Sequence, residues 1–224
     1  MDPYVEYTNP NLQFSFDLNK NRLFTRNQEN FINRLGRDNL NTLGNVSLLD
    51  IYLSRGHVVE PHYHQNAAEL VYATAGSAAV SLINPFTNQV TTVMISPGQV
   101  ANIPQGWWHW EVALEDNTHL LAIFDAPYPE YIFGSDILTK TPIDVLAHTY
   151  CLDRELLSKA LQPLNNETII IGPTDQCVMQ MHRNQQTAGY TQQSYEQQAY
   201  PSYSQQQPVV DFNTPYPVQG QTYR

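Results

Sequence analysis

The chain has few charged residues, and most of them are acidic. Charged side chains make up 14% of its 224 residues, with 11 Lys and Arg against 21 Asp and Glu, so the formal net charge is −10. A nucleic-acid surface needs a basic patch that neutralises phosphates, and an anionic membrane attracts polybasic segments. The sequence therefore predicts neither a nucleic-acid partner nor a membrane partner.

Cysteines and long apolar runs are also scarce. Cys151 and Cys177 are the two cysteines, too few to indicate a disulfide-built secreted domain in a chain of this length. No run approaches the ~20 apolar residues that span a bilayer. The first residues, MDPYVEYTNPNLQ, lack the basic start and the apolar stretch of a signal peptide. We therefore expect a cytoplasmic protein with reduced thiols.

What the sequence does contain is a series of short β-rich runs between residues 46 and 124. Turn signals such as Gly56, Gly76 and Pro97-Gly98 separate these runs, and no segment with helical periodicity interrupts them. Short strands at this spacing are typical of an all-β sandwich or barrel. The strands expected here are 46–53, 69–75, 77–83, 90–95, 100–103, 107–112 and 119–124.

Composition divides the chain into four parts. Residues 1–40 are expected to form an N-terminal arm, residues 41–140 a β-barrel, and residues 141–183 a helical extension with a final strand. Residues 184–224 are rich in Gln, Tyr, Ser and Pro and cannot bury enough apolar surface to offset their chain entropy. We predict that this tail is disordered and that its Gln and Tyr favour self-association and assembly.

Within these parts, smaller elements are expected from local signals. The alternation from Phe14 to Leu18 has the period of an edge strand. Thr141, followed by Pro142, is typical of a helix start, and the helix should run to Tyr150. Asp153 should open a second helix, and the apolar run 168–171 should form the final strand.

Three side chains that suit a metal ion lie between residues 56 and 76. His62 and His64 are two positions apart, so on a strand they point to the same face. A short turn follows, and Glu69 then opens the next strand, close enough to add a carboxylate to the same site. Two imidazoles and one carboxylate that converge inside a barrel bind a divalent cation well.

A fourth candidate ligand comes from a later segment. Pro97-Gly98 and Pro104-Gln-Gly106 make two tight turns that deliver His109 to another strand, where it supplies a third imidazole. A single His on an apolar strand is usually an ordinary core or surface residue, but four such groups in this order indicate a site. Three histidines and one glutamate leave open positions on a six-coordinate metal, and catalysis needs open positions.

These segments resemble the motifs of the cupin superfamily. The first motif, G-x5-H-x-H-x3,4-E-x6-G, is matched at every position of residues 56–76. The second, G-x5-P-x-G-x2-H-x3-N, is matched from Gly98 onward, except that Ala113 replaces the final Asn. The resemblance implies an all-β jelly-roll barrel, or double-stranded β-helix, here with short C-terminal helices and a disordered tail. It implies that one divalent metal ion is held by His62, His64, Glu69 and His109.

Within the superfamily, the chain is similar to the oxalate decarboxylase and germin-like branch. The similarity covers residues 40–170 and rests on segments such as His62–Glu69 and Ile123–Asp125. This branch implies Mn²⁺ as the usual metal, whereas the ligand set itself also suits Fe, Ni, Co or Zn. It further implies a small carboxylate as the ligand, and a homo-oligomer by analogy with related barrels.

Two positions depart from active members of that branch. Their Arg three residues before the first ligand histidine holds a substrate carboxylate, and here this position is Val59, which has no group for such a bidentate contact. Their lid carries a Ser-Glu-Asn segment whose Glu handles the proton, whereas Glu130 is the only acid in the corresponding loop, 126–135. Glu130 is therefore the candidate catalytic residue, and activity on oxalate is left open.

Two charged residues near the metal motif each allow two interpretations. Glu60 shares strand parity with His62, which would aim it inward, but Pro61 interrupts the strand, so we expect an exposed carboxylate. Arg55 is near enough in sequence to reach an anionic ligand, although a surface ion pair is the stronger expectation.

Three functions fit these observations. The first is a metal-dependent enzyme that acts on a small carboxylic acid, related to oxalate decarboxylation or oxidation, in which Glu130 moves a proton. The second is a non-catalytic cupin of a structural layer, such as a spore coat, that assembles through the tail. The third is a cupin that binds a sugar or another small molecule, for which no residue gives specific support.

Overall fold

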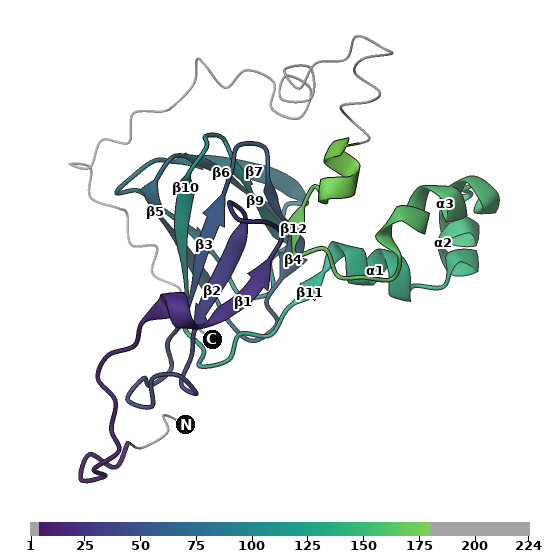
Figure 1. Cartoon of the computed structure of the whole chain (residues 1–224). Helices are drawn as coiled ribbons and strands as arrows, with labels where there is room; N and C mark the ends of the chain where they lie inside the picture. The colour runs from purple at the N-terminus through teal and green to yellow at the C-terminus, as the bar shows by residue number, and fades with distance from the viewer. Residues whose placement is uncertain (1–4, 180–224) are drawn as a thin grey trace, which may run out of the picture. The chain divides into compact units, whose positions relative to one another are not determined.

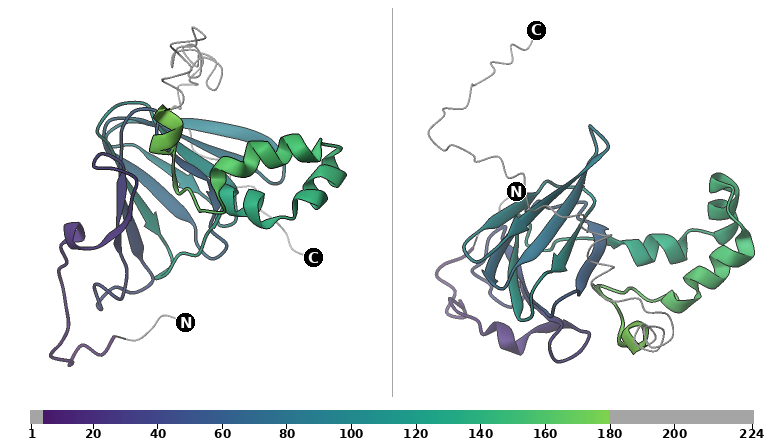
Figure 2. Two further views of the ribbon diagram at one scale, coloured as in Figure 1. Left: turned by 45° about the vertical axis from the view of Figure 1, so that its right-hand side comes forward. Right: turned by 90° about the horizontal axis from the view of Figure 1, so that it is seen from above.

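A computed structural model describes residues 5–179 of the chain. Its main elements are two antiparallel β-sheets that lie face to face (Figures 1 and 2). The tail predicted to be disordered, residues 184–224, lies outside the described residues.

Each sheet combines strands that are far apart in the sequence. Sheet A contains β1 (Arg22–Thr25), β2 (Phe31–Leu35), β3 (Ser47–Leu53), β5 (Glu69–Ala75), β8 (Val100–Ile103) and β10 (Thr118–Phe124). Sheet B contains β4 (Val58–Tyr63), β6 (Ala78–Asn84), β7 (Gln89–Ile95), β9 (His109–Ala113), β11 (Ile132–Phe133) and β12 (Ile171–Gly172). The strand order is β1-β2-β3-β10-β5-β8 in sheet A and β11-β4-β9-β6-β7 in sheet B, where β12 pairs with β4.

Buried and less buried side chains alternate along the strands, and the buried ones form the core between the two sheets. In β10 every second residue is buried, from Thr118 through Leu120 and Ala122 to Phe124. Such a strand turns one face to the opposite sheet, and the burial of its apolar side chains stabilises the pair of sheets. The predicted all-β barrel of the jelly-roll type is therefore confirmed.

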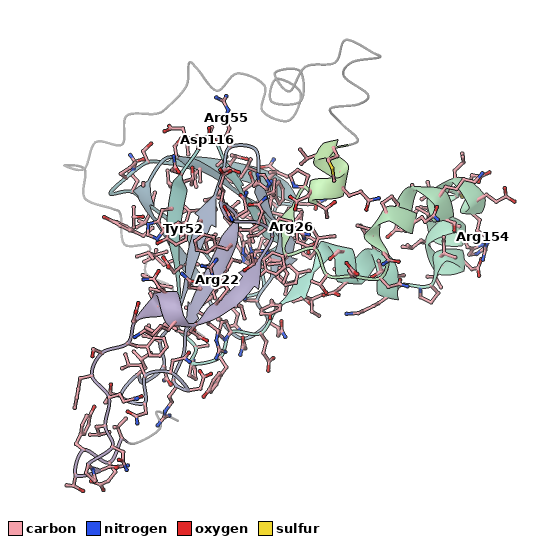
Figure 3. The ribbon with its side chains drawn as sticks, in the orientation of Figure 1. Arg22, Arg26, Tyr52, Arg55, Asp116 and Arg154 are labelled. Atoms are coloured by element: carbon pink, nitrogen blue, oxygen red, sulfur yellow. The ribbon has the colours of Figure 1, made fainter. Side chains whose placement is uncertain are left out.

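Three short helices follow β11. They are α1 (Gly134–Lys140), α2 (Ile143–Tyr150) and α3 (Arg154–Leu161), and 3₁₀ turns lie at Leu18–Lys20 and Gln162–Leu164. The predicted helix starts are close: α2 begins directly after Pro142, and the Asp153 side chain caps α3 by accepting from the Leu156 N–H. Arg154, labelled in Figure 3, pairs with Asp144 across these two helices. None of the helices within residues 5–179 combines the length and the apolar character needed to cross a membrane.

Two expected strands differ from the structure. The strand expected at Phe14–Leu18 is wrong: Phe14 is exposed and Leu18 begins a 3₁₀ turn, whereas β1 and β2 later in the arm extend sheet A. The final strand is shorter than expected, because Ile170 has a left-handed backbone (φ +61°) that interrupts the extended chain before β12. The division at residues 40, 140 and 183 stays a prediction.

Candidate metal centre

Two sheets bring the four predicted side chains together inside the barrel. Each offers one ligand atom, these atoms all lie within 4.8 Å of one another, and the four residues are buried: His62, His64, Glu69 and His109. The register explains the arrangement, because β4 and β9 are neighbours and place His62 opposite His109. Glu69 is the first residue of β5 in the facing sheet. The structure thus brings together the four side chains that the sequence singles out, and their role as metal ligands stays a prediction.

Main-chain carbonyl groups orient all three imidazoles. The Nδ1-to-oxygen distances are 2.7 Å from His62 to Glu60, 3.0 Å from His64 to Glu130, and 2.8 Å from His109 to Trp107. A carbonyl oxygen can only accept, so each Nδ1 carries a hydrogen and donates it. The Nε2 atoms are thereby left to face the centre of the cluster, which is the arrangement found in metal-binding histidines.

The donor set fits a metal ion. His64 Nε2 is buried and has no hydrogen-bond partner, although Glu69 Oε2 is 3.3 Å away. Since His64 Nδ1 donates to a carbonyl oxygen, a neutral His64 turns a lone pair toward the carboxylate, so two acceptors face each other. A cation between them would satisfy both lone pairs.

Without a metal, the centre is held by an ion pair. Burial works to raise the pKa of Glu69, but the hydrogen bond from His109 and the positive charge of His109 outweigh burial and hold the pKa well below its usual range. Burial works in the opposite sense on His109, yet its hydrogen bond to Glu69, at 2.9 Å, and the charge of Glu111 raise the pKa of His109 to about 9. Burial and the neighbouring His109 lower the pKa of His62. His109 therefore holds a proton that a metal ion would have to displace.

A second carboxylate, Glu111, also points into the barrel. It lies on β9 two residues after His109, on the same face, and only 1% of it is exposed. Its Oε1 atom has no hydrogen-bond partner and lies 3.7 Å from His109 Nε2. Burial and the charge of Glu69 raise the pKa of Glu111 to about 8. The cupin motifs do not point to Glu111, although its strand parity with His109 is a signal that places it inside.

The loop with Glu130 is fixed to the turn between β4 and β5. The main-chain N–H of Glu130 donates to Asn66 Oδ1 (2.8 Å), and its carboxylate accepts from Gln65 Nε2 (3.1 Å). Its main-chain carbonyl is the group that orients His64. Glu130 itself is exposed, so its contact with the cluster is made by the main chain. A catalytic role for its carboxylate stays a prediction.

An irregularity in β4 decides which neighbours of the histidines face the site. The pairing of β4 with β9 shifts between Val59 and His62, and both of these residues are buried. Glu60 turns the other way, but it is not exposed as expected. It is 8% exposed and accepts hydrogen bonds from the N–H and hydroxyl of Ser135 and from the N–H of Ile170. The expectation was wrong because later segments cover this side of β4.

The branch's substrate-binding arginine has no counterpart beside the cluster. Val59, at that position, lies in the apolar core. Arg55 is exposed before β4, and its main-chain N–H donates to Asp116 at the same end of the barrel (Figure 3). In residues 5–179, the buried polar and charged residues include no Lys or Arg.

Comparison with known proteins agrees with this architecture. Residues 16–157, more than half of the chain, match the family profile described as Cupin. The chain is 28% identical over 167 residues to a probable oxalate decarboxylase of Arthroderma benhamiae, covering 71% of this chain and 40% of that protein. It is 27% identical over 121 residues to germin-like protein 1-2 of Oryza sativa subsp. japonica, covering 52% and 53% of the two chains.

Solved structures show the same fold. Oxalate decarboxylase from Bacillus subtilis at pH 4.6 superposes with a TM-score of 0.62 at 22% identity, over 70% of this chain and 40% of that chain. The chain thus spans less than two thirds of the length of each of these relatives.

Proposed function

Because this chain belongs to the cupin family, we propose that it holds one divalent metal ion and binds a small carboxylic acid beside it. The proposed ligands are His62, His64, Glu69 and His109. One observation carries the proposal: four buried ligand atoms lie within 4.8 Å of one another, and every imidazole has its Nδ1 occupied by a main-chain carbonyl. Such preorganised histidines are typical of metal sites.

Mn²⁺ is the metal that we propose. Its support is the resemblance to the oxalate decarboxylase branch, since imidazole and carboxylate ligands also suit Fe, Co, Ni and Zn. A divalent ion in this place supplies Lewis acidity and open positions for oxygen atoms of the ligand. The protein contributes the orientation of the four side chains and a surrounding shell of buried residues.

The metal centre is tested by binding, without reference to activity. We expect one Mn²⁺ per chain in equilibrium titrations of the metal-free protein. His62→Ala should weaken binding by more than the ~10- to 100-fold that loss of an outer-shell partner costs. His148→Ala is the matched control, because His148 is exposed on α2. Equal affinity in the two variants would reject the proposed ligand set.

The enzyme form of this proposal gives Glu130 the role of moving a proton. Its support is the position of the loop 126–135, whose main chain contacts His64. The assay uses Mn²⁺-loaded protein with oxalate at acidic pH and measures CO₂, formate and peroxide. Glu130→Gln should lower any product formation to the level of His62→Ala. No product above that level from the unsubstituted protein would reject an oxalate-converting enzyme.

A non-catalytic cupin is the second candidate, and two observations favour it. Val59 replaces the branch's substrate-binding arginine, and the carboxylate of Glu130 is exposed and bound to Gln65. In this case the metal centre would bind its ligand without turnover, and residues 184–224 would mediate assembly. Deletion of 184–224 should then abolish self-association in sedimentation experiments and leave Mn²⁺ affinity unchanged. Self-association that survives the deletion would count against this function.

A further inference from the structure

Glu111 contributes an unsatisfied oxygen to the barrel interior. Within residues 5–179, the buried side-chain atoms without a hydrogen-bond partner include a single carboxylate oxygen, Glu111 Oε1. It lies on the same face of β9 as His109 and 3.7 Å from His109 Nε2, the atom assigned to the metal. Burying an acceptor without a donor costs free energy, so a native structure that keeps one usually has a use for it.

The geometry places Glu111 beside the ligand set and outside it. The group of atoms within 4.8 Å of one another contains four residues, and Glu111 is not one of them. It is nonetheless close to one of their ligand atoms, His109 Nε2. A carboxylate at this distance from a ligand atom would lie close to a molecule bound at the metal.

The protein supplies no hydrogen-bond donor to Glu111 Oε1 from the neighbouring strands. Glu111 is opposite Val59 on β4 and opposite Val80 on β6, and both valines belong to the apolar core. The buried polar and charged residues of the described chain include no Lys or Arg that would pair with it. A donor on a molecule bound at the centre would satisfy this oxygen.

We propose that Glu111 accepts a hydrogen bond from a hydroxyl group of the bound acid and thereby shifts the preference of the centre toward 2-hydroxy monocarboxylates. This inference rests on the proposed metal centre. A hydroxyl group satisfies Oε1 as a donor, and a carboxyl group keeps an acceptor oxygen in either protonation state. An ionised Glu111 has no donor for the second carboxylate of a dicarboxylate such as oxalate, which would place acceptor oxygens against it, with Val59 where the branch has its arginine.

Ligand binding to the metal-loaded protein tests this preference. Glycolate and oxalate are titrated into Co²⁺-loaded protein, and the visible absorption of Co²⁺ gives the two dissociation constants. Oxalate is intrinsically the stronger chelator, so the quantity compared is the ratio of the oxalate constant to the glycolate constant. We expect this ratio to be ~10- to 100-fold larger in the unsubstituted protein than in Glu111→Leu. Glu167→Gln is the charge control, because Glu167 is exposed, and it should keep the unsubstituted ratio.

A second variant guards against a folding defect. Glu111→Gln keeps the shape of the side chain and adds N–H donors, so it should also lower the ratio, by strengthening oxalate binding. A ratio that stays the same in both variants, or oxalate binding that weakens in both, would overturn the role of Glu111. If Co²⁺ binds but neither acid changes its spectrum, the inference and the carboxylate part of the proposed function both fail. If Co²⁺ does not bind, the metal centre itself is rejected.

Discussion

Two buried carboxylates on neighbouring strands have opposite surroundings. Glu60 on β4 is 8% exposed and Glu111 on β9 is 1% exposed. Glu60 accepts three hydrogen bonds, from the Ser135 N–H (2.9 Å), the Ser135 hydroxyl (2.9 Å) and the Ile170 N–H (2.6 Å). Glu111 Oε1 accepts none. The fold thus supplies the hydrogen-bond donors of Glu60, whereas Glu111 Oε1 is available to accept a hydrogen bond from a ligand.

The partners of Glu60 explain what the satisfied carboxylate does. They come 75 and 110 residues later in the chain, so Glu60 ties the start of α1 and the segment before β12 to β4. Ile170 has a left-handed backbone, which is costly for a β-branched residue. It exchanges two bonds with Glu60, because the Glu60 N–H also donates to the Ile170 carbonyl at 2.9 Å. We infer that Glu60 is a structural group, whereas Glu111 costs stability and serves the site.

Removal of the Glu60 carboxylate should have the largest effect on stability. Glu60→Leu leaves two buried main-chain N–H groups and a hydroxyl without their acceptor. At ~1–3 kcal/mol for each group left unsatisfied, the free energy of unfolding should fall by about 3–9 kcal/mol. Urea-induced unfolding of the metal-free protein at constant pH measures this change.

Glu111→Leu is the matched comparison in the same unfolding experiment. Leucine removes the cost of burying a carboxylate oxygen that accepts no hydrogen bond, and this gain offsets the loss of the 3.7 Å interaction with His109. We expect the free energy of unfolding to stay within about 1 kcal/mol of the unsubstituted protein or to rise. Equal destabilisation by the two leucine variants would remove the distinction between the carboxylates.

The pH dependence of stability should separate the two sites further. The folded state raises the pKa of Glu111 from 4.5 to about 8, so it binds this proton more tightly than the unfolded state does. The resulting stabilisation is complete below pH 4.5 and is lost as the pH rises toward 8. Relative to Glu111→Gln, the unsubstituted metal-free protein should therefore lose up to ~1.4 kcal/mol per pH unit above pH 4.5.

The cleanest range for this measurement is pH 4.5 to 6.5. The lowered pKa of His62 changes stability with the opposite sign below pH 6.5, but this effect is common to both proteins and cancels in their difference. The raised pKa of His109 contributes above pH 6.5. Parallel stability curves for the two proteins between pH 4.5 and 6.5 would contradict the prediction.

The sequence predicts elements best where local signals determine them. The strands 69–75 and 100–103 agree with the structure at both ends, since Gly76 and Pro97-Gly98 supply the turns beside them. The metal cluster follows from the two-residue spacing of His62 and His64 on one strand and from turns that place the other ligands. These signals are local, so a single sequence is enough to read them.

The two carboxylates could not be assigned from local signals. The surroundings of Glu60 depend on Ser135 and Ile170, which are distant in sequence and become neighbours only when α1 and β12 return to β4. Strand parity places Glu111 inside the barrel, but parity does not reveal whether a donor faces it. That requires the strand order, which puts Val59 and Val80 on either side.

The pH dependence of metal affinity should show how far the charge of Glu111 raises the pKa of His109. A metal ion must displace the His109 proton, whose pKa is about 9, so the apparent affinity should rise by up to ~10-fold per pH unit between pH 7 and 9. The charge of Glu111 is one cause of this raised pKa. In Glu111→Gln the rise should therefore level off at a lower pH. Competition with a chelator of known pH dependence measures both curves, and a flat curve above pH 7 in the unsubstituted protein would contradict the prediction.

A smaller destabilisation than that of Glu60→Leu is predicted for the loss of one donor to Glu60. Ser135→Ala removes the hydroxyl that donates to Glu60 and that accepts from the Ile169 N–H at 3.1 Å, but it keeps the main-chain donor of residue 135. The free energy of unfolding should fall by about 1–2 kcal/mol, with Co²⁺ and glycolate binding unchanged. Thr139→Val is the control, because its hydroxyl bonds only main-chain carbonyls of α1, at Ser135 and Asp136, and not Glu60.

Ser135→Ala should lower the free energy of unfolding by less than Glu60→Leu does. If Glu60 is held by several donors, the loss of one should cost a fraction of what Glu60→Leu costs, because the main-chain donors of Ser135 and Ile170 remain. Destabilisation by Ser135→Ala as large as that by Glu60→Leu would mean that the hydroxyl group, and not the carboxylate, holds the junction. The hydrogen bonds of the Glu60 carboxylate would then contribute little to stability. The difference in stability between Glu60 and Glu111, from which we infer that Glu111 serves the ligand, would disappear.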